Sequence, residues 1–317
     1  DFLKKESLLN IPNDIDVAFY LIHSMSTQIG DFENMEEICA TNFKNCIEKT
    51  NAKQVIYLSG ISNAEDLSKH LSSRKNVESI LSGSNFALTT LKAGIIVGSG
   101  SASFEIIRDL VEKLPIMITP RWLKTKCQPI AIRNVVEFLI GVIGRQDTYN
   151  QSYDIGGPDI LTYKEMLMRF AKVRKLKRRI FIVPIMTPKL SSYWLYFVTS
   201  TSYALAQNLV NSMKIEVICK PNNLADLLGI TYIDYDSSIR LAFDKISQNQ
   251  VLSSWKDAQT SDIFSTGFTK FIEVPVNGCY KDIRTVQIEN IELSTDKIWS
   301  IGGKTGWYYG NWMWKIR

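Results

Sequence analysis

"DVAFYLIHS", Asp16 to Ser24, is the stretch of sequence that decides the fold. It is a nearly continuous apolar run, which is typical of a strand buried on both faces of a parallel sheet. The apolar residues after it recur at three- and four-residue steps, as on one face of a helix; they are Ile29, Phe32, Met35, Cys39, Phe43 and Cys46. A buried strand followed by an amphipathic helix is the building unit of α/β domains.

The same alternation continues along the chain. Strands are predicted at "KQVIYLSG" (53–60) and "NFALTTLKAG" (85–94), with the helix "SKHLSSRKNVESIL" (68–81) between them. Thr162 and Glu165 form a capping box that predicts the start of a later helix. Helices are expected over residues 103–114, 132–143 and 161–173. Connections this short predict a doubly wound parallel sheet with right-handed crossovers.

In such a sheet, ligands bind beyond the carboxyl ends of the strands, where His23, Ser59 and Gly94 fall. We expect the α/β domain to span residues 1–247 and the polar stretch 248–262 to be a linker. Residues 263–317 are expected to begin a small α+β domain. Its predicted elements are strands at 268–278 and 284–293 and a helix at 294–303.

The composition is that of an ordinary globular protein, with 317 residues, 45% hydrophobic, 22% charged and a net charge of +5. The five cysteines are scattered, and His23 and His70 are the only histidines. We therefore expect no disulfide framework, no metal site and a reducing, cytoplasmic location. The basic run "KVRKLKRRI" (172–180) is typical of a solvated helix end, with a phosphate or anionic-lipid patch as the alternative.

Several other function classes find little support. The uncharged segment Leu190 to Met213 contains many Ser, Thr, Asn and Gln residues, so we expect a buried or groove-lining helix and no transmembrane segment. A nucleic-acid binder would need more than one basic run. A hydrolase with a serine nucleophile would need a GxSxG elbow, which the sequence lacks. A dinucleotide site normally has GxGxxG, and "GSGSAS" (98–103) is the nearest string.

Four motifs, taken in order, nevertheless resemble the atypical, NmrA-like members of the short-chain dehydrogenase/reductase superfamily, which have NAD(P)-binding Rossmann domains. "DVAFYLIHS" is similar to the family's DxVxHxAA strand, and "QVIYLSGIS" to the strand that carries the active-site serine, here Ser59. "LKAGIIVGSGS" resembles the RPxxVYGPG turn beside the nicotinamide, and "QPIAIRNVVEFLI" the VxVxDVAxAL helix. The resemblance covers residues 1–247 and implies a Rossmann-like fold.

The resemblance also implies contacts with NAD or NADP. Residues 1–2 would be the tail of the pair that grips adenine, residues 21–23 would pass the adenosine half, and residues 94–95 would run beside the nicotinamide. Asn42 matches the asparagine of the following helix. The expected cofactor-binding residues are Asp1, Phe2, Leu21, Ile22, His23, Asn42, Ser59, Arg74, Gly94 and Ile95.

On this resemblance we expect the chain to be truncated at both ends. The glycine loop and first βαβ portion would lie upstream of Asp1, and the final "IWSIGGKTGWYYGNWMWKIR" (298–317) looks like the start of a DUF2867 domain, a START-like module.

The helix at 68–81 matches the family's YxxSKxxxE motif, with His70 at the Tyr position and Arg74 at the Lys position. The family's Tyr donates the proton and its Lys holds the ribose. Arg74 keeps the donors but behaves as a fixed charge, and it would hold a neighbouring imidazole neutral. The plainer readings are a surface or pocket-lining His70, an Arg74–Glu78 ion pair, and a Ser59 that only ends a strand.

Three function hypotheses follow. The first is an NAD(P)-dependent oxidoreductase acting on an apolar carbonyl or alcohol, with Ser59, His70 and Arg74 as its catalytic residues. The second is a non-catalytic NAD(P)-binding sensor or assembly factor, because both Tyr and Lys are replaced. The third is a lipid-handling protein, suggested by the START-like end and the uncharged segment. The expected partner is a small, apolar molecule, without nucleic acid.

Overall fold

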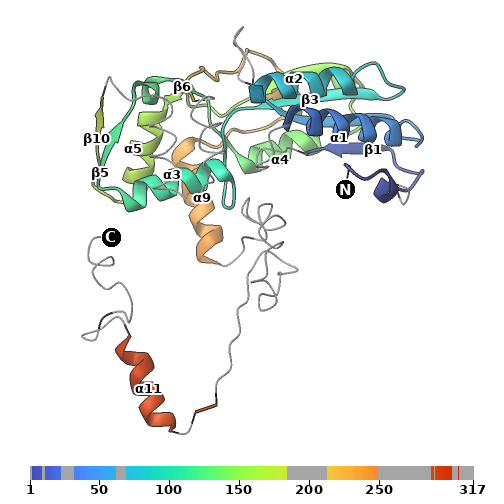
Figure 1. Ribbon diagram of the computed structural model, residues 1–317. Helices are drawn as coiled ribbons and strands as arrows, with labels where there is room; N and C mark the ends of the chain where they lie inside the picture. Colours follow the sequence, from blue (N-terminus) through green and yellow to red (C-terminus); the bar gives the residue numbers. More distant parts are fainter. Residues whose placement is uncertain are drawn as a thin grey trace. The chain divides into compact units, whose positions relative to one another are not determined.

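The computed structural model describes residues 2–8, 11–22, 32–61, 69–183, 213–248, 251, 287–288, 290–301 and 306 (Figure 1). The chain divides into two compact units, Asp1–Ile263 and Phe264–Arg317. The described part of the second unit is mainly helix α11 (Ile291–Ser300), which begins at the N-cap Asn290. A strand was expected over 284–293, but its last residues are helical because the Asn290 side chain accepts a hydrogen bond from the amide of Leu293.

The first unit is built on a parallel sheet, as predicted. The strand order is β1-β2-β3-β8, and every neighbouring pair is parallel. The strands are β1 (Val17–Tyr20), β2 (Gln54–Gly60), β3 (Ala87–Ala93) and β8 (Gln151–Ile155). The longest pairing joins β2 and β3, where Ser59 lies opposite Lys92 and Gly60 opposite Ala93.

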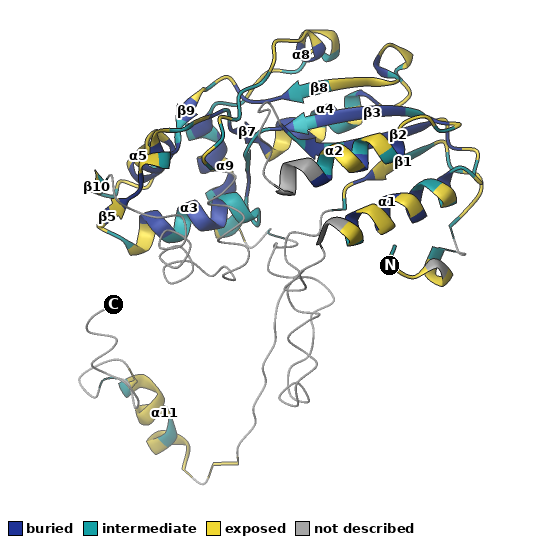
Figure 2. Ribbon diagram, turned by 45° about the horizontal axis from the view of Figure 1, so that its top comes forward, coloured by how far each residue is buried: buried dark blue, intermediate teal, exposed yellow. Residues whose placement is uncertain are grey.

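Helices cover both faces of this sheet. Side chains alternate along β2, so Val55 and Tyr57 pack in one core with Phe43 and Val77, while Ile56 packs in another with Phe138. The helices on the first face are α1 (Phe32–Ile47) and α2 (Lys69–Leu81), and those on the second are α4 (Ile132–Gly141) and α8 (Leu224–Leu228). Figure 2 shows α1 and α2 buried toward the sheet and exposed outside. The doubly wound α/β prediction is therefore confirmed; we call this part the sheet half.

A third core lies beside the sheet half, and we call the part of the chain built around it the lobe. Its helices are α3 (Ala102–Lys113), α5 (Tyr163–Val173) and α9 (Tyr235–Ser247). One aromatic ring from each helix meets the other two, with centroids 5.7 Å apart for Phe104–Phe170, 5.4 Å for Phe104–Phe243 and 5.6 Å for Phe170–Phe243. These contacts join residues that are far apart in the sequence.

Short strands and turns complete the first unit. β4 (Ile96–Val97) pairs with β7 (Ile130–Ala131), β5 (Ile116–Thr119) with β10 (Arg179–Ile182), and β6 (Lys126–Cys127) with β9 (Leu161–Thr162). The 3-10 helices are η1 (Lys5–Leu8), η2 (Arg121–Lys124) and η3 (Gln146–Thr148). The predicted capping box is confirmed, because Thr162 and Glu165 bond each other's backbone amides at the start of α5.

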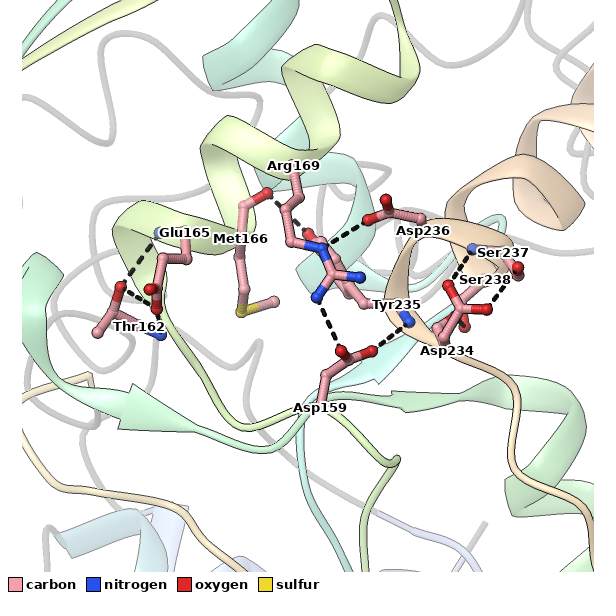
Figure 3. A network of polar contacts seen from close by, with 10 residues as sticks. All are labelled: Asp159, Thr162, Glu165, Met166, Arg169, Asp234, Tyr235, Asp236, Ser237 and Ser238. Atoms are coloured by element: carbon pink, nitrogen blue, oxygen red, sulfur yellow. Dashed lines mark hydrogen bonds and ion pairs between the residues drawn. The ribbon is translucent and has the colours of Figure 1, made fainter.

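A polar network ties α9 to α5 (Figure 3). Arg169 on α5 pairs with Asp159 at 2.8 Å and with Asp236 at 2.7 Å. Asp159 also accepts a hydrogen bond from the amide of Tyr235, whose hydroxyl donates to the Met166 carbonyl at 3.2 Å. One arginine thus joins the loop before β9, helix α5 and the first turn of α9.

Gln128 connects the sheet half to the chain segment that contains Val217 and Cys219. Its side chain donates to the Gly157 carbonyl at 2.7 Å and accepts from the Cys219 amide at 3.0 Å. Its own carbonyl oxygen lies so close to Gly94 that a Cβ there would be 2.1 Å away. Gly94 is therefore required by packing, whatever ligand it also meets.

Much of the basic run around the end of α5 has structural contacts. Arg174 pairs with Glu112 at 3.1 Å and lies 4.0 Å over the Phe243 ring. Arg178 donates to the carbonyls of Val111 and Glu112 at the C-terminal end of α3. These contacts favour the helix-end interpretation. Within the described residues, no helix is long and apolar enough to cross a membrane, and the segment Leu190 to Met213 lies outside them except for its last residue.

Candidate functional site

The helix predicted to carry the active site, α2, is anchored to the sheet beside the ends of β2 and β3. The Tyr57 hydroxyl on β2 donates to the Arg74 carbonyl at 3.3 Å. Glu78 pairs with Lys92 on β3 at 3.0 Å, and the buried Ser73 hydroxyl donates to Glu36 on α1. The alternative Arg74–Glu78 pair is thus not formed, because Glu78 bonds Lys92.

The Arg74 side chain extends from α2 to the carboxyl end of β2. Its guanidinium lies against Gly60, where a Cβ would be only 2.8 Å from Nη1. Burial lowers the pKa of this guanidinium below its usual value, although Tyr57 and Glu36 oppose the shift. An arginine nevertheless stays charged at neutral pH. Because residue 60 is a glycine, the Arg74 guanidinium can lie against the carboxyl end of β2.

Arg74 has unused hydrogen-bonding capacity. Its Nε is buried and has no hydrogen-bond partner, and the Arg74 side chain forms no ion pair with any described residue. Buried donors of this kind are rare in folded proteins, because leaving one unmade costs about 1–3 kcal/mol. Because the folded chain leaves this Arg74 nitrogen without a partner, we interpret Arg74 as a candidate ligand contact.

Ser59 sits next to this guanidinium. It is 3% exposed and precedes Gly60 at the end of β2. Burial raises the pKa of Tyr57, and a hydrogen bond with Ser59 partly opposes that shift. Ser59 is thus a buried hydroxyl at a strand end, in the position that the sequence predicted.

Ser59 and Arg74 line one cavity of about 420 Å³ together with Leu21, Gly94 and Ile95. These residues come from the ends of β1, β2 and β3 and from α2. The crevice predicted at the carboxyl edge of the sheet therefore exists, and it brings together five of the expected site residues. Its volume lies in the range of small-molecule sites, about 300–1,000 Å³.

The opposite wall of the cavity comes from the lobe and is mainly apolar, with hydroxyls at Ser101, Ser103 and Thr119. It contains Ile106, Ile107 and Leu110 of α3 with Met166 and Leu167 of α5. Trp122 of η2 and Tyr163 also line it, with their rings edge-on at 6.2 Å. The Trp122 Nε1 is buried without a hydrogen-bond partner, and burial raises the pKa of Tyr163. No pattern in the sequence points to Trp122, and the helix expected over 103–114 was predicted without its contact with a cavity.

The other expected site residues lie elsewhere or outside the description. Asn42 on α1 donates to the Phe2 carbonyl at 2.7 Å, and the Phe2 ring packs 5.5 Å from Phe43. Ile22 packs on the α1 side of the sheet. Neither Phe2, Ile22 nor Asn42 lines the cavity, and their cofactor role stays a prediction. Asp1 and His23 lie outside the described residues, and His70 belongs to α2 but its side chain is not described.

The fold has clear counterparts among solved structures. A nucleoside-diphosphate-sugar epimerase from Staphylococcus aureus matches with a TM-score of 0.60 and 13% identity over 76% of this chain and 81% of that chain. The Citrobacter sp. triphenylmethane reductase complexed with NADP(H) matches with a TM-score of 0.59 and 12% identity over 76% and 81%. The Bacillus cereus UDP-glucuronic acid 4-epimerase, in complex with UDP-glucuronic acid and NAD, matches with 0.56 and 11% over 78% and 80%.

These identities establish the fold. The first unit has a Rossmann-like architecture of the kind found in epimerases and reductases. No family model matches the sequence, and the comparison with curated proteins gives no match. The expected DUF2867 and START-like end gains no support from these comparisons, and its final residues lie outside the described part of the chain.

Proposed function

We propose that this protein is an NAD(P)-dependent oxidoreductase of the atypical short-chain type, acting on an apolar carbonyl or alcohol. The observation that carries the proposal is the convergence of Ser59, Arg74 and Gly94 on one cavity at the carboxyl ends of adjacent parallel strands. Two of the similar structures, the 4-epimerase and the triphenylmethane reductase, are complexes with NAD and NADP(H), which supports the choice of cofactor.

The described residues fit the nicotinamide end of such a cofactor. Arg74 offers unpaired donors for ribose hydroxyls, and Leu21, Gly94 and Ile95 line the cavity beside it. The sequence contains no GxGxxG to cradle the pyrophosphate, so the fit concerns this end alone. When bound, the cofactor supplies or accepts the hydride.

The protein's own groups have separate tasks in this proposal. The Ser59 hydroxyl orients the substrate oxygen, and Arg74 holds the ribose. His70, four residues before Arg74 on the same helix, relays the proton.

Cofactor binding and turnover test the proposal directly. NADH and NADPH are titrated against the protein by their fluorescence, and a panel of apolar ketones, aldehydes and alcohols is screened for turnover. We expect one dinucleotide to bind and at least one substrate to react. Absence of binding by both dinucleotides contradicts the proposal.

His70→Ala separates the catalytic role from the binding role. We expect turnover to fall by about 100-fold or more while cofactor affinity is kept. His70→Gln is a matched variant that keeps a hydrogen-bonding side chain without the titration. Unchanged turnover in His70→Ala would refute the role of His70.

A non-catalytic NAD(P)-binding protein is the second candidate. His70 and Arg74 replace the family's phenol and amine, and the Tyr57 hydroxyl is engaged with the Arg74 carbonyl and absent from the cavity lining. This candidate predicts cofactor binding without oxidation across the whole panel. Hydride transfer to any substrate would eliminate it.

A lipid-handling protein is the third candidate, favoured by the apolar wall formed by α3 and α5. Mass spectrometry of the purified chain tests it. A co-purifying lipid in the absence of any dinucleotide binding would favour this candidate over the other two.

A further inference from the structure

Two residues that line this cavity each have one buried nitrogen without a hydrogen-bond partner. These nitrogens are Nε of Arg74, at the sheet edge, and Nε1 of Trp122, in the lobe. No other buried side-chain nitrogen or oxygen among the described residues is left without a hydrogen bond. Folded proteins rarely leave such groups unsatisfied, so their coincidence on one cavity indicates a molecule with hydrogen-bond acceptors.

The charge of the cavity lining limits which kinds of ligand can bind there. Arg74 is the one charged side chain among the described residues that line the cavity. The neighbouring Glu78 is engaged with Lys92. The buried carboxylate of Glu36 on α1 acts on Arg74 from outside the cavity, but Glu36 does not line the cavity and no ion pair joins it to Arg74. A buried cation that is not directly paired is destabilising. A ribose hydroxyl would supply an acceptor but no charge, whereas a monoanion supplies both.

The cavity wall formed by α3 and α5 indicates what the rest of the ligand is made of. Ile106, Ile107, Leu110, Met166 and Leu167 present hydrocarbon surface to the cavity. Such a surface favours an apolar chain or ring and offers no partner to further polar groups. The polar side chains of the described lining are Arg74, Ser59, Tyr163 and Trp122, together with the hydroxyls of Ser101, Ser103 and Thr119, and Arg74 is the one that carries a charge.

We propose that the cavity binds an apolar carboxylic acid, with its carboxylate at Arg74 and its hydrocarbon body against α3 and α5. A carboxylate carries one negative charge, which the single arginine balances, and its planar pair of oxygens fits a guanidinium. A phosphate monoester would bring a second charge without a partner. The five donors of Arg74 can serve this carboxylate and a ribose hydroxyl together.

This assignment deepens the proposed function and rests on it for the chemistry. Ser59 is the chain neighbour of Gly60, against which the Arg74 guanidinium lies, so the proposal puts the reacting carbon beside Ser59 and near the carboxylate. The substrate class is then an oxo acid or its hydroxy acid. NAD(P)H gives a hydride to the carbonyl carbon, a proton reaches its oxygen, and NAD(P)⁺ and the hydroxy acid are formed.

Binding of decanoate and of 1-decanol to the full chain tests the assignment without nucleotide. Isothermal titration calorimetry at pH 8, where the acid is ionised, gives both dissociation constants. We expect decanoate to bind about 10-fold more tightly or better, because a hydrogen bond to a charged group contributes about 1.5–3 kcal/mol. A purely apolar cavity would prefer the alcohol, since a carboxylate costs more to dehydrate. Equal or stronger binding of 1-decanol overturns the proposal.

Variants locate the site. Arg74→Gln should abolish the preference for decanoate and leave 1-decanol binding within about 2-fold. Trp122→Phe keeps the ring and loses the donor, and should weaken decanoate by about 5-fold. Arg121→Gln, an exposed arginine next to Trp122 that does not line the cavity, is the control and should change neither. A kept preference in Arg74→Gln, with a native circular dichroism spectrum, refutes the carboxylate site.

Should Arg74→Gln fail to fold, Arg74→Lys is the second variant: it keeps a cation but loses the paired donors of the guanidinium, and it should weaken decanoate while leaving 1-decanol within about 2-fold. NADH and NADPH titrations keep the two proposals separate. Dinucleotide binding without a decanoate preference sinks the acid site and keeps the oxidoreductase. Selective decanoate binding without dinucleotide binding does the reverse.

Discussion

In the sheet half, β2 pairs with β3 over seven consecutive residues, whereas the longest pairing in the lobe, between β5 and β10, covers four. The lobe is joined instead by side chains, through the Phe104, Phe170 and Phe243 rings and through Arg169. Main-chain hydrogen bonds between strands do not depend on any one side chain, whereas an assembly held by a few side-chain contacts loses much of its stability when one of them is removed. We therefore expect the lobe wall of the cavity to be the more easily altered by mutation.

The largest expected effect is on the aromatic contact in the lobe. Phe170→Ala, at a fully buried position, should lower the free energy of unfolding by about 3–5 kcal/mol in urea titrations. Hydrogen exchange should speed up in α3, α5 and α9 before it does in β2 and β3. Phe138→Ala, equally buried under the sheet, is the matched variant. Equal loss of protection in both halves would show that they unfold as one unit.

A smaller effect is expected at Arg169. Arg169→Met leaves Asp159 and Asp236 without their cation and should cost about 1–2 kcal/mol, because both carboxylates are partly buried with it. Urea unfolding at neutral pH measures the loss. Arg133→Met, whose pair with Glu137 is mostly exposed, is the control and should cost little. Equal costs for the two variants would contradict the clamp role.

The smallest effect concerns the capping box of α5. Thr162→Ala should cost about 1 kcal/mol at neutral pH. Hydrogen bonds from Thr162 hold the pKa of Glu165 below its usual value, so their contribution is present at neutral pH and lost as pH falls through that pKa. The difference between native protein and variant should therefore shrink below about pH 4. A difference that is constant with pH would exclude this coupling.

The two halves also differ in how far sequence predicts them. β1, β2, β3, α1, α2 and α4 were predicted within a few residues, because their periodicities are local and their apolar residues face two cores. The strands β4, β6, β7 and β9 have two residues each and exist through distant partners, which leaves no local pattern. Helix α9 was missed, although Asp234 as N-cap and the spacing of Ile239, Ala242 and Phe243 were a usable signal.

Only the part of the candidate site at the edge of the sheet was predicted from the sequence, and the part formed by the lobe was not. Ser59, Arg74, Gly94, Ile95 and Leu21 meet at the cavity because strand ends share an edge, a rule that sequence order can apply. Trp122 and Tyr163 belong to segments that tertiary packing brings there. The contact of the Arg74 guanidinium with the glycine after Ser59 is a tertiary feature that no local pattern predicts.

The carbonyl of Gln128 packed against Gly94 changes how mutagenesis of this position is to be understood. An added methyl group would push on the Gln128 backbone and, through its amide, on the chain at Gly157 and Cys219. Inactivity of Gly94→Ala would thus report damage to a seam that three chain segments share. A nucleotide contact at Gly94 is better probed from the cofactor's side, with nicotinamide analogues of different bulk.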